Sequence, residues 1–156
     1  MSQKVEVYLE IEKDSNIKYE FDKQKNELII DRILPYPYYY PYPYGFIPNT
    51  LAMDGDDLDI LVITDQKLEK NTYHNVYIIG VLVMEDEKGM DEKVLCVLEN
   101  DYENIKNITD LDVAILENIK WFFTNYKSKT PGKWSCVLGY EDANFAIDLY
   151  KNSITK

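Results

Sequence analysis

Four carboxylates lie within six residues in the segment Asp-Gly-Asp-Asp-Leu-Asp at positions 54–59. Carboxylates at this spacing repel one another in a folded protein unless a cation neutralises them, and hard divalent cations prefer carboxylate oxygens as ligands. Gly55 permits a tight turn among the acids. The segment therefore predicts a site for divalent metal ions. It is not an EF-hand loop, because that loop requires glycine at its sixth position, where this chain has Asp59.

The neighbouring segments favour this interpretation over the alternative of an acidic turn that only keeps the surface soluble. The apolar run at 60–63 predicts a buried strand that holds the acids at its mouth. A Tyr- and Pro-rich segment at 35–48 precedes the acids, and a second acidic cluster at 85–93 lies between two apolar runs. Core-like strands flank the aromatic segment, so we interpret it as a rigid wall of phenols rather than a flexible polyproline ligand for another domain.

Length and charge limit the possible classes of protein. The chain of 156 residues has the length of one ordinary domain, so we expect a single domain over residues 1–156. The formal net charge of -11 argues against a nucleic-acid partner and against an anionic membrane, because both repel an acidic protein. A bound divalent cation fits this charge better.

Cysteine usage indicates the compartment. Cys96 and Cys136 both lie in apolar surroundings, and each predicts a buried thiol rather than half of a disulfide or part of a zinc site. The first residues do not form the apolar core of a signal peptide, and no apolar run is long enough to span a bilayer. We therefore expect a cytoplasmic protein with no membrane partner.

The first two-thirds of the chain predicts mostly strands. They are expected at 5–11, 17–22, 28–33, 60–63, 76–84 and 93–98. The first has the alternation of a strand with one buried face, the next two form a hairpin around a turn at 23–26, and the run at 76–84 is either a strand pair or one strand bent at Gly80. Strands this short and numerous can close into a small barrel.

Three charged residues of the predicted hairpin lie among apolar neighbours. Lys18 and Glu20 are two residues apart on one strand, so their side chains point to the same side, and Arg32 lies on the presumed partner strand. They form either a cross-strand salt bridge or part of a functional site.

The last third of the chain predicts helices packed against the strands. Thr109 can cap a long helix. Its apolar stripe, with a spacing of three to four residues, consists of Leu111, Ile115, Ile119, Phe122 and Tyr126. Pro131 and Gly132 end that unit, a strand is possible at 134–138, and a short terminal helix is expected at 141–151.

The chemistry of these parts is that of metal-assisted attack on phosphate. Two carboxylate clusters can hold several magnesium ions, and scattered lysines and arginines can hold an anion. Bound metal ions neutralise phosphate oxygens and lower the pKa of a water molecule, while fixed cations hold the leaving group.

The acidic segment resembles the D-G-D-P-x-D signature of the family I soluble inorganic pyrophosphatases, and the resemblance covers nearly the whole chain. Further motifs are similar in order and spacing: Ile17-Lys18-Tyr19-Glu20, Asp31-Arg32, Tyr40-Pro41, Tyr44-Gly45, Gly80-Val81-Leu82, Asp86-Glu87, Asp91-x-Lys93, Phe122-Phe123, Tyr126-Lys127 and Gly132-Lys133-Trp134. One departure stands out, since Asp57 occupies the position of the signature's proline.

The resemblance implies a fold and a function. The fold is mainly β with peripheral helices: a highly twisted, OB-like barrel of five strands, with a long helix in the last third and a short terminal helix. The function is Mg²⁺-dependent hydrolysis of inorganic pyrophosphate to two orthophosphates, with several ions in each active site. The short chain resembles the compact bacterial type, which favours a homohexamer.

The resemblance also implies roles for individual residues. Metal ligands would be Glu10, Asp54, Asp59, Asp86 and Asp91. Asp56 matches the carboxylate that takes the proton from a water molecule between two metal ions, and Asp91 is the next candidate for that role. Substrate-binding positions would be Lys18, Glu20, Arg32, Tyr44, Lys93, Tyr126 and Lys127, while Tyr40 and Glu87 match cavity-lining positions.

Two other functions stay open from the residues alone. The same acids could serve another Mg²⁺-dependent phosphohydrolase acting on nucleotides or phosphomonoesters. An OB-like barrel rich in tyrosine could also be a binding module that stacks on single-stranded nucleic acid, although that mode requires a basic groove.

Overall fold

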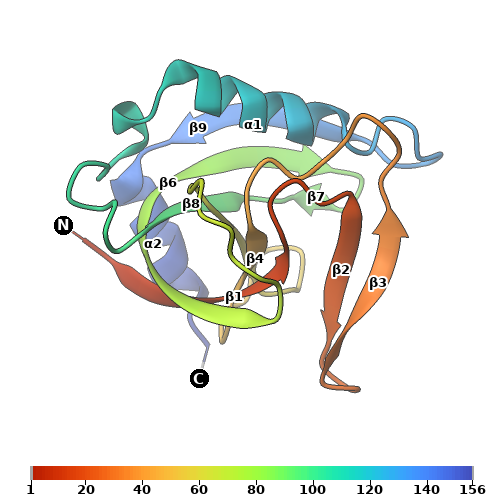
Figure 1. Cartoon of the computed structure of the whole chain (residues 1–156), viewed down its shortest axis with the longest axis horizontal. Helices are drawn as coiled ribbons and strands as arrows, with labels where there is room; N and C mark the ends of the chain where they lie inside the picture. The colour runs from red at the N-terminus through yellow and green to blue at the C-terminus, as the bar shows by residue number, and fades with distance from the viewer. Residues whose placement is uncertain (1, 156) are drawn as a thin grey trace.

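A closed ring of five strands forms the body of the molecule in the computed structural model, which describes residues 2–155 (Figure 1). The strands follow one another around the ring as β1 (Lys4–Ile11), β4 (Tyr44–Ile47), β5 (Leu58–Val62), β8 (Lys93–Leu98) and β6 (Thr72–Asp86). Strand β1 pairs with β6 as well as with β4, and this second pairing closes the ring. The five-stranded, OB-like barrel predicted from the sequence is thus confirmed.

Strand β6 runs along much of the barrel as a single strand of 15 residues. It pairs with β1, β8 and the outer strand β9 (Ser135–Glu141), and its end pairs with the short β7 (Gly89–Met90). Its register with β8 shifts between Ile78 and Gly80. Of the two alternatives for 76–84, one bent strand is therefore correct.

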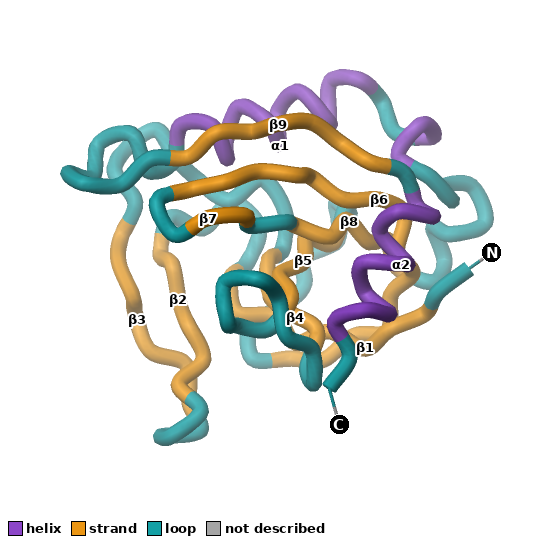
Figure 2. Tube along the Cα trace, turned by 180° about the vertical axis from the view of Figure 1, so that it is seen from behind, coloured by secondary structure: helices purple, strands orange, loops and turns teal. Residues whose placement is uncertain are grey.

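A separate hairpin stands beside the barrel and forms its own two-stranded sheet. Strand β2 (Ile17–Asp22) pairs antiparallel with β3 (Glu27–Ile33), and Lys18 lies directly opposite Arg32. Figures 1 and 2 view the molecule from opposite sides, and both show the hairpin projecting away from the ring. The predicted hairpin is confirmed.

Two helices pack outside the barrel, as predicted. Helix α1 (Val113–Asn125) lies against β9 and buries Ile119, Phe122 and Phe123, while α2 (Ala143–Ser153) packs on β6. Asp142 caps α2, because its carboxylate accepts a hydrogen bond of 3.0 Å from the Phe145 N–H. Among the described residues, no helix is long and apolar enough to cross a membrane.

The predicted start of the long helix was wrong. Thr109 lies in a separate 3₁₀ turn, η1 (Ile108–Asp110), and α1 begins four residues later at Val113. A capping box between Asn107 and Asp110 stabilises that turn, and Leu111 then adopts an extended conformation. The extended backbone at Leu111 therefore ends the turn, and α1 begins after a new N-cap at Asp112.

Burial is more extensive on the strands than alternation predicted. Adjacent residues of β5 and β8 fall in different apolar clusters, with Ile60 and Cys96 in one and Leu61 and Leu95 in the other. Both faces of these strands are therefore covered, which explains their continuous apolar sequences. On β1, the expected single buried face was wrong, because Tyr8 and Glu10 are buried as well. The prediction of a buried Cys136 was also wrong, since this thiol is exposed.

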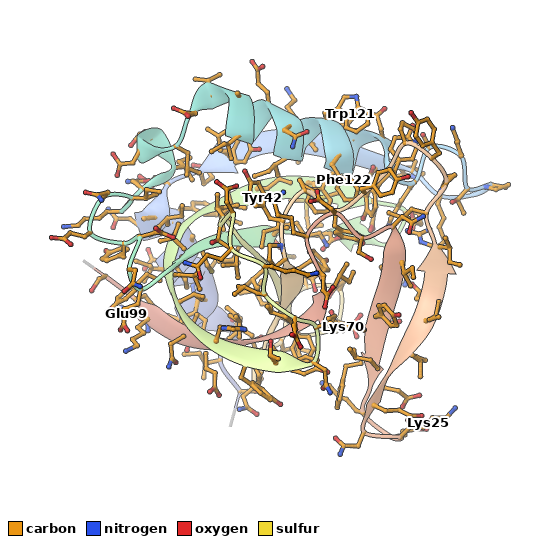
Figure 3. All side chains as sticks on the ribbon, viewed as in Figure 1. Lys25, Tyr42, Lys70, Glu99, Trp121 and Phe122 are labelled. Carbon is orange, nitrogen blue, oxygen red and sulfur yellow. The ribbon has the colours of Figure 1, made fainter. Side chains whose placement is uncertain are left out.

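The Tyr- and Pro-rich segment forms a packed wall rather than a free ligand. Tyr38, Tyr40, Tyr42 and Tyr44 are buried. The Tyr40 ring lies 4.7 Å from the Phe122 ring and 5.2 Å from the Tyr44 ring, measured between centroids. Figure 3 shows Tyr42 and Phe122 between the barrel and α1. Aromatic packing fixes the position of Tyr44, the last residue of this wall.

Gly45 allows β1 and β4 to approach closely enough to pair. A Cβ atom at this position would overlap the backbone carbonyl of Tyr8. We expect Gly45→Ala to lower the free energy of unfolding by roughly 3 kcal/mol, because the two strands must separate. Gly132→Ala is the control, since that site has a positive φ of 78° but open space around it, and it should cost roughly 1 kcal/mol. Urea unfolding measures both, and equal losses would contradict the packing explanation.

Candidate active site

A cavity of about 380 Å³ lies between the hairpin, the acidic loop at 54–57, the end of β6 and the C-terminal end of α1. The structure brings every residue predicted for the site to the wall of this one cavity: Glu10, Lys18, Glu20, Arg32, Tyr44, Asp54, Asp56, Asp59, Asp86, Asp91, Lys93, Tyr126 and Lys127. Tyr40 and Glu87, the two lining positions, are there too. The residues thus share a site, while their individual roles stay predictions.

Three carboxylates converge at one end of the cavity. Asp54, Asp59 and Asp91 each offer an oxygen, and these oxygens lie within 4.8 Å of one another. Strands β5 and β8 pair in parallel with Asp59 opposite Lys93, so Asp91 arrives beside Asp59. Asp54 comes from the loop before β5, where its carboxylate accepts a 3.0 Å hydrogen bond from the Asp56 N–H. The arrangement matches the oxygen ligands that a hard divalent cation requires.

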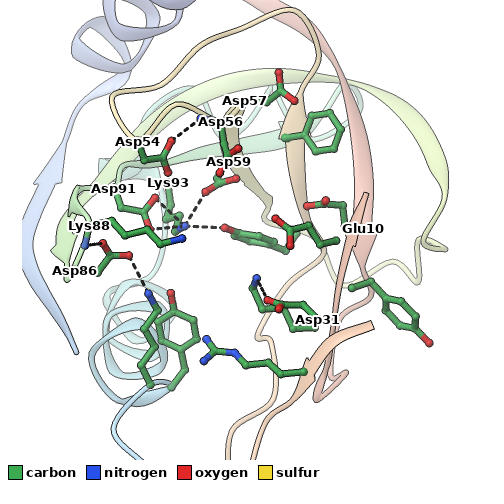
Figure 4. Close-up of a pocket in the computed structure, with 18 of the residues that line it drawn as sticks. Glu10, Asp31, Asp54, Asp56, Asp57, Asp59, Asp86, Lys88, Asp91 and Lys93 are labelled. Atoms are coloured by element: carbon green, nitrogen blue, oxygen red, sulfur yellow. Dashed lines mark hydrogen bonds and ion pairs between the residues drawn. The ribbon is translucent and has the colours of Figure 1, made fainter. Parts of the chain in front are cut away.

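The ammonium of Lys93 lies among these acids (Figure 4). It is 2.8 Å from Asp59 and 3.0 Å from Asp91, it donates a 2.7 Å hydrogen bond to the Tyr44 hydroxyl, and the residue is only 3 % exposed. Burial opposes the charge of Lys93, but Asp59, Tyr44 and Asp91 outweigh it and raise its pKa well above the ordinary value. Lys93 is therefore a fixed cation that relieves the repulsion between the acids.

Two of the converging acids hold protons more tightly than usual. Burial raises the pKa of Asp91, and the neighbouring Asp59 adds to this effect, although Lys93 opposes it. Partial burial likewise raises the pKa of Asp54. Both directions are those expected of carboxylates that face other carboxylates in a partly dry site, and a divalent cation would reverse them.

Glu10 is a second unusual acid in the cavity. It lies on β1, is 8 % exposed, and accepts a 2.8 Å hydrogen bond from the Phe21 N–H of the hairpin. Burial raises its pKa to about 8, and the nearby charges of Asp59 and Glu20 contribute, while the hydrogen bond and Lys18 oppose the shift. Without metal ions, Glu10 is therefore largely protonated at neutral pH.

The opposite side of the cavity carries cations. Lys127 follows the end of α1 and lies 2.9 Å from Asp86 and 3.4 Å from Glu87. Burial alone would raise the pKa of Asp86, but its hydrogen bonds from Lys127 and from the Lys88 N–H lower it overall. Asp86 is thus ionised and held by Lys127 at the edge of the second acidic cluster.

Arg32 on β3 carries buried nitrogens that lack hydrogen-bond partners. Its Nε and Nη1 atoms are buried and have no hydrogen-bond partner, and its guanidinium lies 5.9 Å from the Tyr126 ring centroid. Between the two strands of the hairpin, Lys18 forms an ion pair with Asp31 at 2.6 Å, so the salt bridge considered among Lys18, Glu20 and Arg32 is not what the structure shows. A buried guanidinium without partners is costly, and an anion in the cavity would satisfy it.

Several lining residues were not predicted from the sequence as part of the site. They are Tyr19, Phe21, Lys23, Asp31, Phe46, Asp57, Lys88 and Lys133. Tyr19, Asp31 and Lys133 had a signal, since each lies within one of the quoted motifs, and Lys88 adjoins the motif residue Glu87. Lys23 had none, because only the folded hairpin brings its turn to the cavity.

Comparison with known proteins agrees with this geometry. The family model described as inorganic pyrophosphatase matches residues 7–156. The chain belongs to the inorganic pyrophosphatase family. Its predicted function, hydrolysis of inorganic pyrophosphate by an inorganic diphosphatase, is thereby confirmed. The family is metal-dependent, as the acidic cluster requires.

Individual relatives are similar over almost their full length. The inorganic pyrophosphatase of Campylobacter jejuni is 44% identical over 155 residues, which cover 97% of this chain and 90% of that protein. A solved structure of the Helicobacter pylori inorganic pyrophosphatase has a TM-score of 0.94 at 41% identity, covering 97% of this chain and 92% of that one. The Thermus thermophilus inorganic pyrophosphatase structure has a TM-score of 0.93 at 37% identity, covering 97% and 89% of the two chains.

The raised pKa of Glu10 predicts a pH-dependent stability of the metal-free protein. The pKa is about 8 in the folded state against an ordinary value of 4.5 for a glutamate, so the folded state retains a proton that the unfolded state has lost. Stability from this group is complete below the unfolded pKa and is lost as the pH rises through the folded pKa. Glu10→Gln should therefore be more stable than the parent by roughly 2–4 kcal/mol near pH 8.5, and nearly equal to it near pH 4.5.

Urea unfolding in the presence of a chelator tests this difference. The matched control is Glu6→Gln on the same strand, because Glu6 is exposed. A Glu10→Gln advantage that stays constant across the pH range would contradict the burial of an ionisable group at this position.

Proposed function

We propose that the cavity hydrolyses pyrophosphate with magnesium ions held at its acidic end and the phosphates held by cations at its other end. The observation that carries this proposal is the meeting of Asp54, Asp59 and Asp91 in one cavity with the unpaired Arg32. A phosphate substrate that binds metal ions can interact with the carboxylates through those ions and with the cations through its own negative charges. Pyrophosphate has this character.

The acids suit magnesium by their chemistry. Every candidate ligand is a carboxylate oxygen, which fits a hard cation and leaves room for water and phosphate oxygens in the coordination shell. We assign Asp54, Asp59 and Asp91 as the primary ligands, with Glu10 and Asp86 available to further ions. When bound, magnesium neutralises phosphate oxygens and lowers the pKa of the attacking water.

Asp56 is proposed to take the proton from the attacking water. It is exposed to the cavity between two proposed ligands, Asp54 and Asp59, and no ion pair of Asp56 is among those formed by the described residues. Its backbone N–H is used to fix the Asp54 carboxylate, so the turn orients acceptor and ligand together. Asp91 is the second candidate, but its carboxylate is held by Lys93.

The phosphate groups are proposed to bind along the cation side. Arg32 and Lys18 extend from the hairpin, Lys127 and Tyr126 come from the end of α1, and Lys93 with Tyr44 lies between the substrate and the acids. The planar guanidinium of Arg32 can donate two parallel hydrogen bonds to one phosphate. Burial raises the pKa of Tyr126, so its hydroxyl keeps the proton with which it can donate a hydrogen bond. Glu20 completes this side of the cavity.

Assembly and location are proposed as well. We propose that residues 1–156 form one domain, supported by the two apolar clusters that join the ring to both helices. We propose a homo-oligomer, with a hexamer favoured, because the short chain resembles the compact bacterial type of the family. A cytoplasmic location is supported by the free thiols of Cys96 and Cys136.

Replacing two neighbouring acids separates the proton acceptor from a metal ligand. Asp56→Asn should lower kcat for pyrophosphate by roughly a hundredfold to ten-thousandfold, because it removes a positioned base. Its magnesium affinity should stay near that of the parent. Asp59→Asn should lose both activity and magnesium affinity, because a neutral amide is a weaker ligand for a divalent cation.

Phosphate release and magnesium calorimetry measure the two quantities on the same samples. Asp65→Asn, an exposed carboxylate outside this cavity, controls for a simple loss of surface charge. Normal turnover of Asp56→Asn would contradict its role and move the proton acceptor to Asp91.

Arg32→Met should impair substrate binding rather than metal binding. Losing charged hydrogen bonds to a phosphate should raise KM by roughly ten- to hundredfold. Arg32→Lys keeps the charge without the planar fork and should fall between the parent and Arg32→Met. The measurement is KM for magnesium pyrophosphate, with calorimetric magnesium affinity recorded in parallel. If Arg32→Met instead lost magnesium affinity and kept the parental KM, the assignment of Arg32 to phosphate binding would be contradicted.

A further inference from the structure

An ion pair joins the two segments that face each other across the mouth of the cavity. Lys23 Nζ, in the turn of the β2–β3 hairpin, lies 2.9 Å from a carboxylate oxygen of Asp57 in the acidic loop. The Asp57 side chain is 12% exposed, while that of Lys23 is 70% exposed. Both residues line the cavity. Asp57 stands where the family signature has proline, so proline at this position would not provide this contact.

The hairpin is held to the barrel by side-chain contacts rather than by pairing with the strands of the ring, and Tyr19 of β2 packs against one of the apolar clusters. It is a two-stranded sheet on its own, and such sheets are marginally stable without packing. Phe21, the last residue but one of β2, anchors the turn end of the hairpin, because its N–H donates to Glu10 and its ring lies 5.3 Å from the Tyr8 ring and 6.4 Å from the Phe46 ring. Beyond Phe21 the strands lead to the projecting turn at 23–26, whose Lys25 is labelled in Figure 3.

The loop end of the ion pair is firmly placed. Leu58, the residue after Asp57, is fully buried and its N–H donates a 2.9 Å hydrogen bond to Thr50. Asp56, the residue before it, fixes the Asp54 carboxylate through its own N–H. Asp57 is therefore a fixed point on the acidic loop, to which the projecting turn of the hairpin is attached.

We propose that the Asp57–Lys23 ion pair is a positioning contact, which holds the phosphate-binding hairpin over the metal-binding loop before substrate arrives. The hairpin carries Lys18 and Arg32, and the loop carries Asp54 and Asp56. This inference rests on the roles proposed above for those residues. Asp57 and Lys23 touch neither metal nor phosphate in this proposal, since their effect passes through the distance between the two segments.

The proposal determines which kinetic constant must change. Without the ion pair, the hairpin occupies its docked position for a smaller fraction of the time, and the apparent affinity for substrate falls in proportion. Bound substrate docks the hairpin through Arg32 and Lys18, so kcat at saturation is unchanged. Because the pair lies at the surface, its contribution is modest and is screened by salt, and we expect a two- to fivefold rise in KM, as a rough range for exposed pairs.

Steady-state kinetics of the full chain with magnesium pyrophosphate test the proposal. Lys23→Met and Asp57→Asn should each raise KM about two- to fivefold at low salt, and the double variant should be no worse than either single one. Lys23→Arg keeps the pair and should restore the parental KM. Lys25→Met is the matched control, because Lys25 is an exposed lysine of the same turn that does not line the cavity. At high salt the parent and the Lys23→Met variant should converge.

Hydrogen exchange of the hairpin in metal-free, substrate-free protein gives a readout that is independent of catalysis. Lys23→Met and Asp57→Asn should speed exchange in β2 and β3, and Lys25→Met should not. Equal behaviour of Lys23→Met and Lys25→Met overturns the proposal, and so does an unchanged KM in Lys23→Met even if exchange is faster. A failure of the proposed phosphate-binding roles would be seen separately, because Arg32→Met would then keep the parental KM.

Discussion

The mutual repulsion of carboxylates gathered at one end of a closed barrel is the constraint on which the site depends. Parallel pairing of β5 and β8 places Asp59 and Asp91 side by side, and the tight turn before β5 adds Asp54. Such a cluster destabilises the fold unless positive charge is supplied. Lys93 supplies part of this positive charge from inside the cluster. Because β5 and β8 are buried on both faces, their backbone is rigid enough to withstand the repulsion that remains.

The division of charge across the cavity follows from the division of the fold. The acids come mainly from the ring and its loops, whereas Arg32 and Lys127 come from the hairpin and from the end of α1, which lie outside it. Tyr40 and Tyr44 connect these parts through aromatic contacts with Phe122 and Phe123. In the proposed mechanism, the rigid ring holds the metal ions and the attached elements bind the phosphates, which suits a reaction that relies on positioning and charge.

The sequence was informative where local pattern decides the structure, and failed where tertiary contacts do. The hairpin was predicted from its polar turn and strand β8 from its apolar run, and the residues predicted for the site meet in one cavity because the acids are contiguous and the outlying motifs keep their order. The prediction for Thr109 failed because Leu111 adopts an extended conformation, which separates the 3₁₀ turn from α1. Tyr8 is buried because the hairpin ring of Phe21 docks against it, and Lys23 reaches the cavity for the same tertiary reason. The spacing of residues along the sequence gives no indication of these contacts.

Closure of the ring has a consequence for the order in which the chain can fold. Strand β1 takes its second partner from β6, so Lys4 is paired with Tyr77 and Leu9 with Thr72. The β1–β6 pairing, which is the seam of the barrel, thus joins residues far apart in the sequence. The chain must lose the entropy of a long loop before the hydrogen bonds of this pairing can form. A nascent chain leaving the ribosome cannot complete the ring until β6 and β8 have both emerged. The acidic loop is synthesised before that seam exists, and Asp54 and Asp59 meet Asp91 only after the later segment that leads into β8 has emerged.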